Sequence, residues 1–347
     1  MSGTSLDGID AALIRSDGQS VFERGSALTQ PYDLAFRERL RGLLGGSGPV
    51  AEVECELTER HAAAVEALLS TAGLSRDAVS LVGFHGQTIL HAPDKRRTWQ
   101  IGDGPLLARL LGISVVNDFR TADVAAGGEG APLVPVYQQA LAHALAKPLA
   151  VLNIGGVSNV TWIGAEAGQL LACDCGPGNA LLDDWMRLRA GQPFDDGGRA
   201  AATGDVDVDM LAGAMAHPYF TRKPPKSLDR DAFQPEGLEA LSLEDGAASL
   251  VAFTVEAIRA VVPLLPTAPR RWLVTGGGRK NPAIMAALTA ALSAPVGPVE
   301  TVGWDGDAME AEAFAFLAAR ALAELPLTFP GTTGVSAPQT GGRLHQA

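Results

Sequence analysis

The chain has 347 residues, 47% of them hydrophobic, and its 27 basic and 39 acidic side chains give a formal net charge of −12. A chain of this length and composition buries a large core, and we expect two globular domains. The acidic balance excludes a broad basic face for nucleic acid or for an anionic membrane surface. No basic segment precedes an apolar core at the N-terminus, and no run approaches the ~18 apolar residues of a membrane span, so we expect a cytoplasmic protein.

The first ten residues form a turn of small residues that carries hydroxyls and two carboxylates. Glycine lets backbone N–H groups approach a phosphate chain closely, and the hydroxyls add further donors. Asp7 and Asp10 fit beside phosphates only if a cation lies between, and Mg²⁺ held by one or two carboxylates is a common arrangement. The pattern favours a site for a Mg-nucleotide triphosphate, with an Asp-Gly hairpin and solvated acids as the alternative. The candidate ATP-binding residues are Gly3, Thr4, Ser5, Leu6, Asp7, Gly8, Ile9 and Asp10.

Strand-like and helix-like stretches then alternate along the chain, and this alternation predicts an α/β fold. In the first half, the expected strands are 9–14, 20–28, 79–84 and 113–116, and the expected helices are 33–44, 53–72 and 105–111. In the second half, the expected strands are 149–154, 157–163 and 272–275, and the expected helices are 179–188, 248–265, 283–292 and 308–323. The tail beyond residue 323, rich in Pro, Gly and Thr, is expected to be loosely ordered.

A Gly- and Ala-rich segment at residues 121–136 marks the expected crossing between two lobes. We predict an N-terminal lobe of residues 1–125, completed by 331–347, and a C-terminal lobe of residues 126–330. The second lobe begins with a strand, the turn Gly155-Gly156 and a returning strand, which echoes the N-terminus. Further on, the turn at 276–278 leads through Asn281 into a helix, a favourable place for an anion or a nucleotide.

Three familiar kinds of nucleotide site are missing from the sequence. No Lys follows a Gly, so the P-loop motif G-x-x-x-x-G-K-S/T is excluded. No G-x-G-x-x-G follows a strand, and the H-R-D and D-F-G motifs of protein kinases are also missing. What remains is a set of three glycine turns, at 3–8, 155–156 and 276–278, each beside an expected strand. In the sugar kinase, actin and chaperone ATPase superfamily, two strand hairpins bind the phosphates of ATP and a third turn binds the adenosine. The three glycine turns of this chain fit that arrangement.

Several motifs, in order, resemble the bacterial 1,6-anhydro-N-acetylmuramic acid kinase family. The matching segments are 1–10, 85–88, 118–120, 125–135, 152–159, 174–179, 276–278, 307–317 and 328–334. The resemblance implies a two-lobed sugar kinase or actin-like fold with a central cleft, ATP and Mg²⁺ as cofactors, and a homodimer as one option. It also implies a role in peptidoglycan recycling and amino-sugar catabolism.

Members of this family use ATP to phosphorylate O6 of anhydro-N-acetylmuramic acid while water opens the 1,6-anhydro bridge, which gives N-acetylmuramic acid 6-phosphate. In this substrate O6 is tied to C1, so it becomes a phosphoryl acceptor only as the C1–O6 bond breaks. A water must therefore attack C1, and a general base must take its proton.

The resemblance implies a role for each matching residue. Asp174 matches the catalytic base and is expected immediately before a turn at the start of a helix, with a helix-capping acid as the alternative. Glu310 matches a carboxylate near the sugar that helps to orient the water or a hydroxyl, with an ordinary exposed helix acid as the alternative. The implied sugar-binding residues are His85, Gln87, Thr88, Asp118, Arg120, Gly130 and Pro132. The further ATP-binding residues are Gly155, Gly156, Gly276, Gly277, Gly278 and Asn281.

Two of the sugar-binding assignments have open alternatives. A buried structural role is the rival for His85. Arg120 either pairs with the lactyl carboxylate of the sugar or holds Asp118. A role in binding sugar or phosphate is also open for the basic loop at 224–230.

The sequence departs from the family at its start, because relatives carry a short apolar strand before the Met-Ser-Gly turn and this chain shows none. A start codon assigned too far downstream, a shortened chain and a real loss of the strand are the three explanations. We expect the first, because deleting a central strand should cost more than the roughly 5–15 kcal/mol by which a typical domain is stable.

Two other functions compete with this assignment. One is a sugar kinase of the same superfamily that acts on a free hydroxyl, such as that of N-acetylglucosamine, where Asp174 would deprotonate the sugar itself. The other is a non-enzymatic regulator that binds nucleotide to change conformation.

Overall fold

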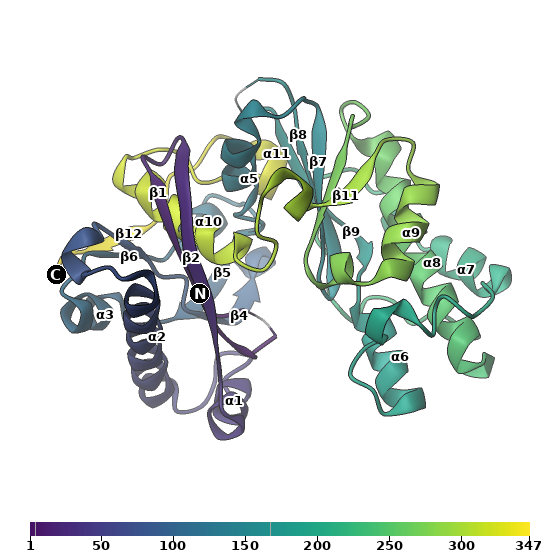
Figure 1. The fold of residues 1–347 in the computed structure, drawn as a ribbon, viewed down its shortest axis with the longest axis horizontal. Helices are drawn as coiled ribbons and strands as arrows, with labels where there is room; N and C mark the ends of the chain where they lie inside the picture. Colours follow the sequence, from purple (N-terminus) through teal and green to yellow (C-terminus); the bar gives the residue numbers. More distant parts are fainter. Residues whose placement is uncertain (4, 167) are drawn as a thin grey trace. The chain divides into compact units, whose positions relative to one another are not determined.

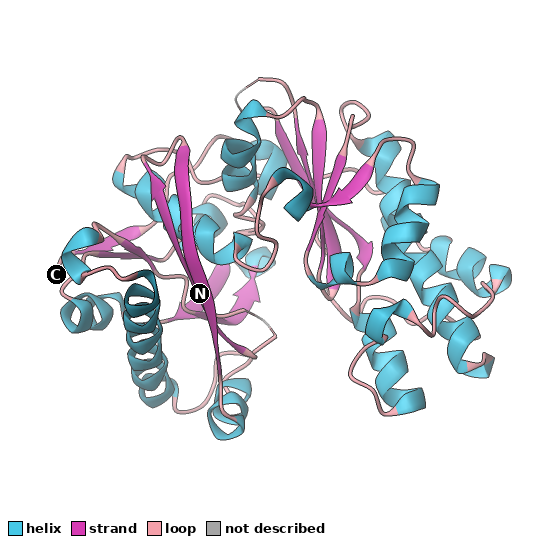
Figure 2. Cartoon of the chain, in the orientation of Figure 1, coloured by secondary structure: helices cyan, strands magenta, loops and turns pink. Residues whose placement is uncertain are grey.

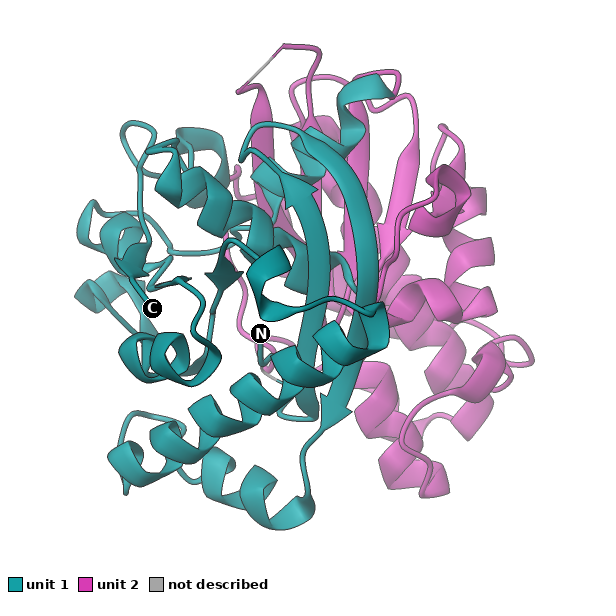
Figure 3. Cartoon of the chain, turned by 60° about the vertical axis from the view of Figure 1, so that its left-hand side comes forward, with its two compact units in different colours: residues 1–144, 308–347 teal, residues 145–307 magenta. Residues whose placement is uncertain are grey.

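Helices and strands alternate through the computed structural model, which describes residues 1–3, 5–166 and 168–347 (Figures 1 and 2). The α/β class predicted from the sequence is confirmed. The chain divides into two compact units: unit 1 comprises residues 1–144 and 308–347, and unit 2 comprises residues 145–307 (Figure 3).

The limits of these units differ from those of the predicted lobes, because segments 126–144 and 308–330 belong to unit 1. Side-chain contacts within unit 1 explain the difference. The Tyr137 hydroxyl donates a hydrogen bond to Glu312 Oε2 over 2.7 Å. Gly83 lies against the helix that contains Phe314, so closely that a Cβ on Gly83 would come 2.1 Å from the carbonyl oxygen of Phe314. Non-local packing of this kind leaves no local pattern in the sequence.

Unit 1 contains most of the short strands. Its strands are β1 (Gly8–Ser16), β2 (Val21–Pro31), β3 (Val82–Gly83), β4 (Gln87–Ala92), β5 (Arg97–Ile101), β6 (Val115–Asn117) and β12 (Arg343–His345). Its helices are α1 (Leu34–Arg41), α2 (Val50–Ala72), α3 (Gly104–Leu111), α4 (Thr121–Ala125), α5 (Pro135–Leu141), α10 (Met309–Leu322) and α11 (Pro330–Thr333). The hairpin β4–β5 was not predicted.

The strands of unit 1 form three small sheets. β1 and β2 pair antiparallel, β4 and β5 pair antiparallel, and β3 lies parallel to β6, which also pairs antiparallel with β12. Helix α2 buries one side of its length, including Val53, Leu57 and Leu68, because apolar residues recur there at helical spacing. Asp33 caps α1 by accepting a hydrogen bond from the N–H of Phe36.

One edge of β1 is occupied by only the first residues of the chain. Ser2 forms an isolated antiparallel bridge with Ile9, and the N–H of Asp10 donates to the carbonyl of Met1 over 2.9 Å. Beyond this bridge, no described strand pairs with this edge, and a cavity of about 80 Å³ lies between β1 and β3. Its lining includes Ala12, Leu13, Leu68, Val82, Phe84 and Ala311.

The C-terminal tail is ordered, so the prediction of a loosely ordered segment was wrong. Leu327, Thr328, Thr333 and Val335 are all buried, and β12 joins the sheet of β6. The composition of the tail is typical of a loop, but its hydroxyls find partners far away in the sequence. These contacts with unit 1 order it.

Unit 2 is built on one five-stranded sheet in the order β11-β10-β7-β8-β9. Its strands are β7 (Leu149–Ile154), β8 (Val157–Ile163), β9 (Leu170–Pro177), β10 (Trp272–Thr275) and β11 (Val296–Pro298). Its helices are α6 (Ala180–Ala190), α7 (Val208–Met215), α8 (Leu243–Val261) and α9 (Pro282–Ala291). The bounds predicted for β7, β8 and β10 match the structure, whereas β9, β11 and α7 were not predicted.

Helix α8 is the central helix of unit 2. Among the described residues, the segment Leu243–Leu264 is the one helical stretch long and apolar enough to cross a membrane, but 61% of its most apolar window is buried inside the protein. Phe253, Ala257 and Ile258 on α8 are fully buried. The apolar composition of α8 is therefore explained by its packing in the core.

Candidate functional site

The turn before β1 presents backbone groups, while its apolar side chains are buried in the core. Leu6 and Ile9 are 3% and 2% exposed, so their side chains are not available to a ligand. A Cβ on Gly8 would lie 2.5 Å from the carbonyl oxygen of Gln30, so this position requires glycine. Thr4, which was predicted to bind ATP, lies outside the described residues.

The two carboxylates of this turn have partners of their own. Asp7 is exposed and its Oδ1 accepts a hydrogen bond from Ser5 Oγ, over 2.7 Å. Asp10 Oδ1 accepts a hydrogen bond from Thr29 Oγ1 over 2.6 Å. No group of three or more His, Cys, Asp or Glu among the described residues is placed to hold a metal ion. A Mg²⁺ ion at this turn would depend on one or two carboxylates together with ligand oxygens.

The carboxyl ends of the parallel strands β3 and β6 meet at a polar cavity of about 450 Å³. Ligands of open α/β sheets bind at this edge. His85 and Asp118, which follow these two strands, both line the cavity, as the sequence predicted for a binding edge. The sequence did not single out its other polar lining residues, namely Glu54, Thr98, Gln100, Asp103, Asn117, Thr121, Arg343 and His345.

Arg120 is held by two hydrogen bonds inside unit 1. Its Nε donates to Nε2 of His85 over 3.0 Å, and its Nη1 donates to the carbonyl oxygen of Gly130 over 2.7 Å. Neither bond goes to Asp118, and no ion pair joins Arg120 to that residue within the described structure. Burial, together with the charge of Arg120, lowers the pKa of His85 well below its ordinary value. His85 is therefore neutral and accepts the Arg120 bond.

Gln87 and Thr88 start β4, but their side chains contact other protein groups. Gln87 is fully buried, and its Oε1 accepts a hydrogen bond from Ser2 Oγ over 2.6 Å. Ser2 in turn accepts a hydrogen bond from the Tyr32 hydroxyl. Thr88 Oγ1 accepts from Nε2 of Gln100 over 3.1 Å. Gln87 therefore joins β4 to the first turn of the chain, which is a structural contact.

Glu310 lies in the first turn of α10, exposed to solvent but surrounded by charged groups of unit 1. Although solvent reaches the side chain, the protein packed around it reduces its hydration and so raises its pKa; Arg120 opposes this shift, and the carboxylates of Asp10 and Asp7 add to it. The structure thus brings Glu310 together with the N-terminal turn and with the Arg120 guanidinium. Glu310 and Arg120, predicted to lie at the sugar, are therefore in the same charged region of unit 1 as Asp7 and Asp10, predicted to bind ATP and Mg²⁺.

In unit 2, the turn Gly155-Gly156 is held against the segment that leads into α6. The N–H groups of Asn179 and Gly178 donate to the carbonyls of Gly155 and Gly156 over 2.7 and 2.9 Å. A Cβ on Gly178 would lie 2.3 Å from the carbonyl oxygen of Gly155. This close approach requires glycine at position 178 and fixes the shape of the turn.

Asp174 lies inside strand β9, so the prediction that it directly precedes a turn at a helix start was wrong. Strand alternation buries Cys173 and Cys175 and leaves the Asp174 side chain half-buried. Asp174 Oδ2 accepts a hydrogen bond from the N–H of Leu228 over 2.8 Å. The N–H of Asp174 itself donates to the carbonyl of Lys226. A helix-capping role is excluded by this position, because α6 starts six residues later.

The basic loop at 224–230 contacts Asp174 and is held by hydrogen bonds and an ion pair inside unit 2. The sequence did not reveal these contacts. Lys226 is 5% exposed, and its Nζ donates to the carbonyl of Tyr219 and lies 4.3 Å from the centre of that ring. The Tyr219 hydroxyl donates to the carbonyl oxygen of Asp174 over 2.9 Å. Arg230 forms an ion pair with Asp184. Lys226 therefore holds the loop beside Asp174.

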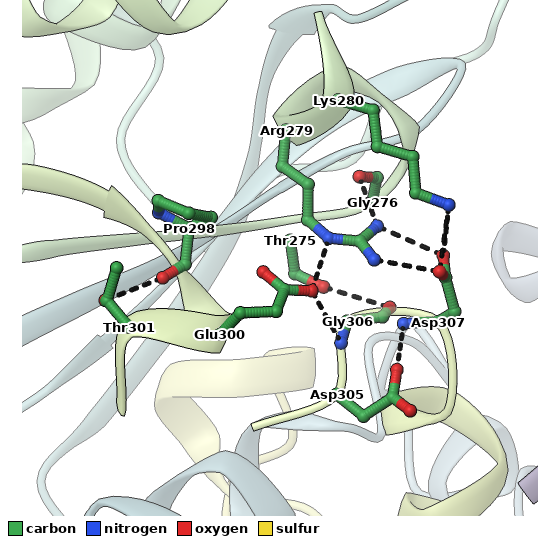
Figure 4. A network of polar contacts seen from close by, with 10 residues as sticks. All are labelled: Thr275, Gly276, Arg279, Lys280, Pro298, Glu300, Thr301, Asp305, Gly306 and Asp307. Carbon is green, nitrogen blue, oxygen red and sulfur yellow. Dashed lines mark hydrogen bonds and ion pairs between the residues drawn. The ribbon is translucent and has the colours of Figure 1, made fainter. Parts of the chain in front are cut away.

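The third glycine turn follows β10 and is held by a network of charged side chains (Figure 4). Arg279 is nearly buried, and its Nη1 donates to the carbonyl of Gly276 over 3.0 Å. Its Nε donates to Glu300 over 2.8 Å, and Lys280 pairs with Asp307 over 2.8 Å (Figure 4). These contacts fix a turn in which Gly276 has a φ of 76°. The glycine turn is therefore rigidly shaped.

Gly277, Gly278 and Asn281 complete this turn. A Cβ on Gly278 would lie 2.4 Å from Ile154 Cγ2, so the turn lies directly on β7. Asn281 Oδ1 accepts hydrogen bonds from the N–H groups of Ala283 and Ile284, so Asn281 caps helix α9. Its side-chain oxygen thus serves the helix, and the nucleotide contact predicted for Asn281 stays a prediction.

These features define an α/β protein of two units, each with glycine turns directly beside its strands. The chain belongs to the anhydro-N-acetylmuramic acid kinase family, because the family model matches residues 1–347. The resemblance noted in the sequence is thereby confirmed.

Relatives named anhydro-N-acetylmuramic acid kinase match along almost the whole chain. The relative from Paramagnetospirillum magneticum is 58% identical, over 99% of this chain and 98% of its own length. The relative from Rhodospirillum rubrum is 56% identical, over 100% of this chain and 93% of its own length.

Among solved structures, similarity is found to component A of the Acidaminococcus fermentans (R)-2-hydroxyglutaryl-CoA dehydratase. It has a TM-score of 0.45 and 12% identity, over 91% of this chain and 99% of that one. The polyphosphate/ATP-glucomannokinase of Arthrobacter gives a TM-score of 0.38 and 18% identity, over 89% and 94% of the two chains. The family assignment rests on the sequence relationship.

Proposed function

We propose that this chain is an ATP-dependent kinase that opens the 1,6-anhydro ring of anhydro-N-acetylmuramic acid with water and phosphorylates O6. The products are N-acetylmuramic acid 6-phosphate and ADP, and the role is peptidoglycan recycling. The observation that supports this proposal most is the family match over residues 1–347, with relatives of that name at 56% and 58% identity.

In this reaction Asp174 would be the general base. It would take the proton of the water that attacks C1, while the C1–O6 bond breaks and O6 attacks the γ-phosphorus of ATP, releasing ADP. The N–H of Leu228 donates to Asp174 Oδ2 and so helps to hold the carboxylate in place. Tyr219 and the Lys226 carbonyl fix the backbone on which that carboxylate stands.

Unit 1 would hold the sugar. The polar cavity at the ends of β3 and β6 offers hydrogen-bonding groups from Asp118 and Gln100 to the hydroxyl and amide groups of an amino sugar. His85, whose two ring nitrogens already bond to Gly86 and Arg120, would orient Arg120. Thr88, Arg120, Gly130 and Pro132 would complete the set. Glu310 would orient the water or a sugar hydroxyl, and its raised pKa suits a group that shares a proton.

The glycine turns would bind ATP through backbone donors, at residues 3–8 in unit 1 and at 155–156 and 276–278 in unit 2. Asp7 and Asp10 would hold a Mg²⁺ ion, which neutralises the charge of the phosphates when it is bound. We further propose a cytoplasmic enzyme that binds neither nucleic acid nor membrane, with a homodimer as one option.

The decisive experiment is incubation with ATP, Mg²⁺ and anhydro-N-acetylmuramic acid in ¹⁸O-labelled water, followed by mass spectrometry. Label at C1 together with phosphate at O6 is the expected product, since the two halves of the reaction leave separate marks. Phosphorylation of free N-acetylglucosamine, with the anhydro sugar left intact, would instead support a kinase for a free hydroxyl. Nucleotide binding with no turnover of either sugar would support a regulator.

A further inference from the structure

Asp123, which follows Arg120 by one helical turn, is a buried carboxylate that accepts hydrogen bonds from three groups. It is 2% exposed. Its Oδ1 accepts a hydrogen bond from the N–H of Gly130 over 2.6 Å. Its Oδ2 accepts from the hydroxyls of Thr328 and Thr333, the second over 2.6 Å. Hydrogen bonds to a carboxylate are among the stronger ones in proteins, so this cluster is a tight junction.

The junction joins the C-terminal tail to the loop that contains Gly130. The N–H of Glu129 donates to the carbonyl of Thr333 over 2.7 Å, which adds a second link between the two segments. The carbonyl of Gly130 accepts the Nη1 bond of Arg120, and Arg120 in turn donates to His85. A continuous series of hydrogen bonds therefore runs from Thr328 and Thr333 to His85.

The geometry at Gly130 shows that its position is tightly determined. Its φ is 68°, and a Cβ there would lie 2.5 Å from Val124 Cγ2. Asp123 holds the N–H of this residue, and Arg120 holds its carbonyl. Burial lowers the pKa of Arg120, while the negative charges of Glu310 and Asp123 oppose that shift. Asp123 thus acts on Arg120 through both the loop and its charge.

We propose that Asp123 is a positioning residue for sugar binding, and that Thr328 and Thr333 of the C-terminal tail lock it in place. This inference rests on the proposed role of Arg120 and Gly130 at the sugar. Asp123 acts through them, and an apolar side chain of similar size would fill the same space without orienting Gly130. The tail then sets the affinity for the sugar without touching it.

The test compares Thr328→Val/Thr333→Val, which removes both hydroxyls at nearly constant volume, with Thr328→Ser/Thr333→Ser, which keeps them. Asp123→Asn forms a third variant. Ser249→Ala is the matched control, because buried Ser249 accepts a hydrogen bond from the N–H of Asp207 in unit 2, far along the chain. The readouts are KM for the anhydro sugar, KM for ATP, kcat, Tm and amide hydrogen exchange at Gly130.

The valine variant is expected to raise KM for the sugar by about tenfold or more and to leave KM for ATP within about twofold, because a displaced orienting group weakens binding of one ligand only. The serine variant should restore the wild-type KM, and Asp123→Asn should behave like the valine variant. Exchange of the Gly130 amide should quicken at least about tenfold. The control Ser249→Ala should lower Tm and leave kcat and both KM values unchanged.

A valine variant with lowered Tm and an unchanged KM for the sugar would overturn the proposal, as would a serine variant that fails to rescue. Equal effects on both KM values would also overturn it. If the valine double variant does not fold, the single change Thr333→Val gives the same comparison with Thr333→Ser. A wild-type protein that does not phosphorylate the anhydro sugar would refute the proposed function. The exchange rate of the Gly130 amide would still show whether Thr328 and Thr333 hold Asp123 and Gly130 in place.

Discussion

Arg120 donates a hydrogen bond from Nε to Nε2 of His85 over 3.0 Å, and this contact determines the tautomer of the histidine. Because Nε2 accepts, the ring proton lies on Nδ1, which donates to the carbonyl of Gly86 over 2.9 Å. Burial is the main cause of the low His85 pKa, and the Arg120 charge adds to it. The neutral imidazole thus orients a guanidinium at the edge where we propose that the sugar binds.

Replacing Arg120 with Lys should weaken sugar binding, because one ammonium group cannot reproduce two guanidinium bonds at different angles. We expect kcat/KM for the anhydro sugar to fall about 30-fold, equivalent to roughly 2 kcal/mol. Steady-state kinetics with varied sugar and saturating ATP measures this. Arg96→Lys is the control, since it also loses a guanidinium bond to a backbone carbonyl of unit 1, that of Ala125. Equal losses in both variants would contradict the assignment of Arg120.

Replacing Asp174 with Asn should leave ATP and sugar binding intact and reduce product formation about 10²- to 10⁴-fold, because the amide cannot accept the proton of the attacking water. The N–H of Leu228 still finds an acceptor in the Asn side chain, so the fold should be preserved. Calorimetric binding and product assays separate the two effects. Asp196→Asn, at an exposed ion pair with Arg199, should stay within about twofold of wild type. Near-normal turnover in Asp174→Asn would refute the role of a base.

Replacing Gly178 with Ala should distort the Gly155-Gly156 turn, because the new Cβ would meet the Gly155 carbonyl oxygen at 2.3 Å. Overpacking of this kind costs about 1–3 kcal/mol, so KM for ATP should rise about tenfold. KM for the sugar should change less. The control is Gly213→Ala on α7, where a Cβ would meet no atom within 4 Å. An unchanged KM for ATP would mean that this turn does not bind the nucleotide.

Stability should fall at mildly acidic pH, and His61 should contribute to the loss. Burial lowers the pKa of His61 from 6.5 to about 3, so below pH 6.5 the unfolded chain binds a proton that the folded protein excludes. The free energy of unfolding therefore falls as the pH drops from 6.5, by about 2 kcal/mol at pH 5 from this one group.

The variant His61→Phe should lose this dependence, and the neighbouring cavity gives the larger ring room. Urea unfolding at pH 5, 6, 7 and 8 measures it: the difference in stability between variant and wild type should shift by about 2 kcal/mol between pH 7 and 5 and stay constant from pH 7 to 8. If the difference in unfolding free energy between variant and wild type stays constant down to pH 5, the folded protein accepts a proton at His61.

Buried strands between glycine turns were the elements that the sequence predicted best. β7 and β10 are mostly apolar runs that end at a glycine, and β8 lies between Gly156 and Gly164, so their limits agreed with the structure. The hairpin β4–β5 was missed because its polar residues, such as Thr88 and Gln100, bond to each other across the strands. Asp174 was misplaced for a related reason, because β9 carries small and polar residues that resemble a loop.

The sequence by itself determined the α/β class, the glycine turns and the family, because these depend on residue types at short spacings. Only the tertiary structure decided which polar side chains already form hydrogen bonds with other parts of the protein. Asp123 meets Thr328 from 205 residues away, and Gln87 meets Ser2 from 85 residues away. Such partners are set by how the chain packs, because a buried donor or acceptor must be satisfied by whichever group the fold brings near. The turn at the start of the chain could therefore be predicted, whereas its junction with β4 and the ordered tail could not.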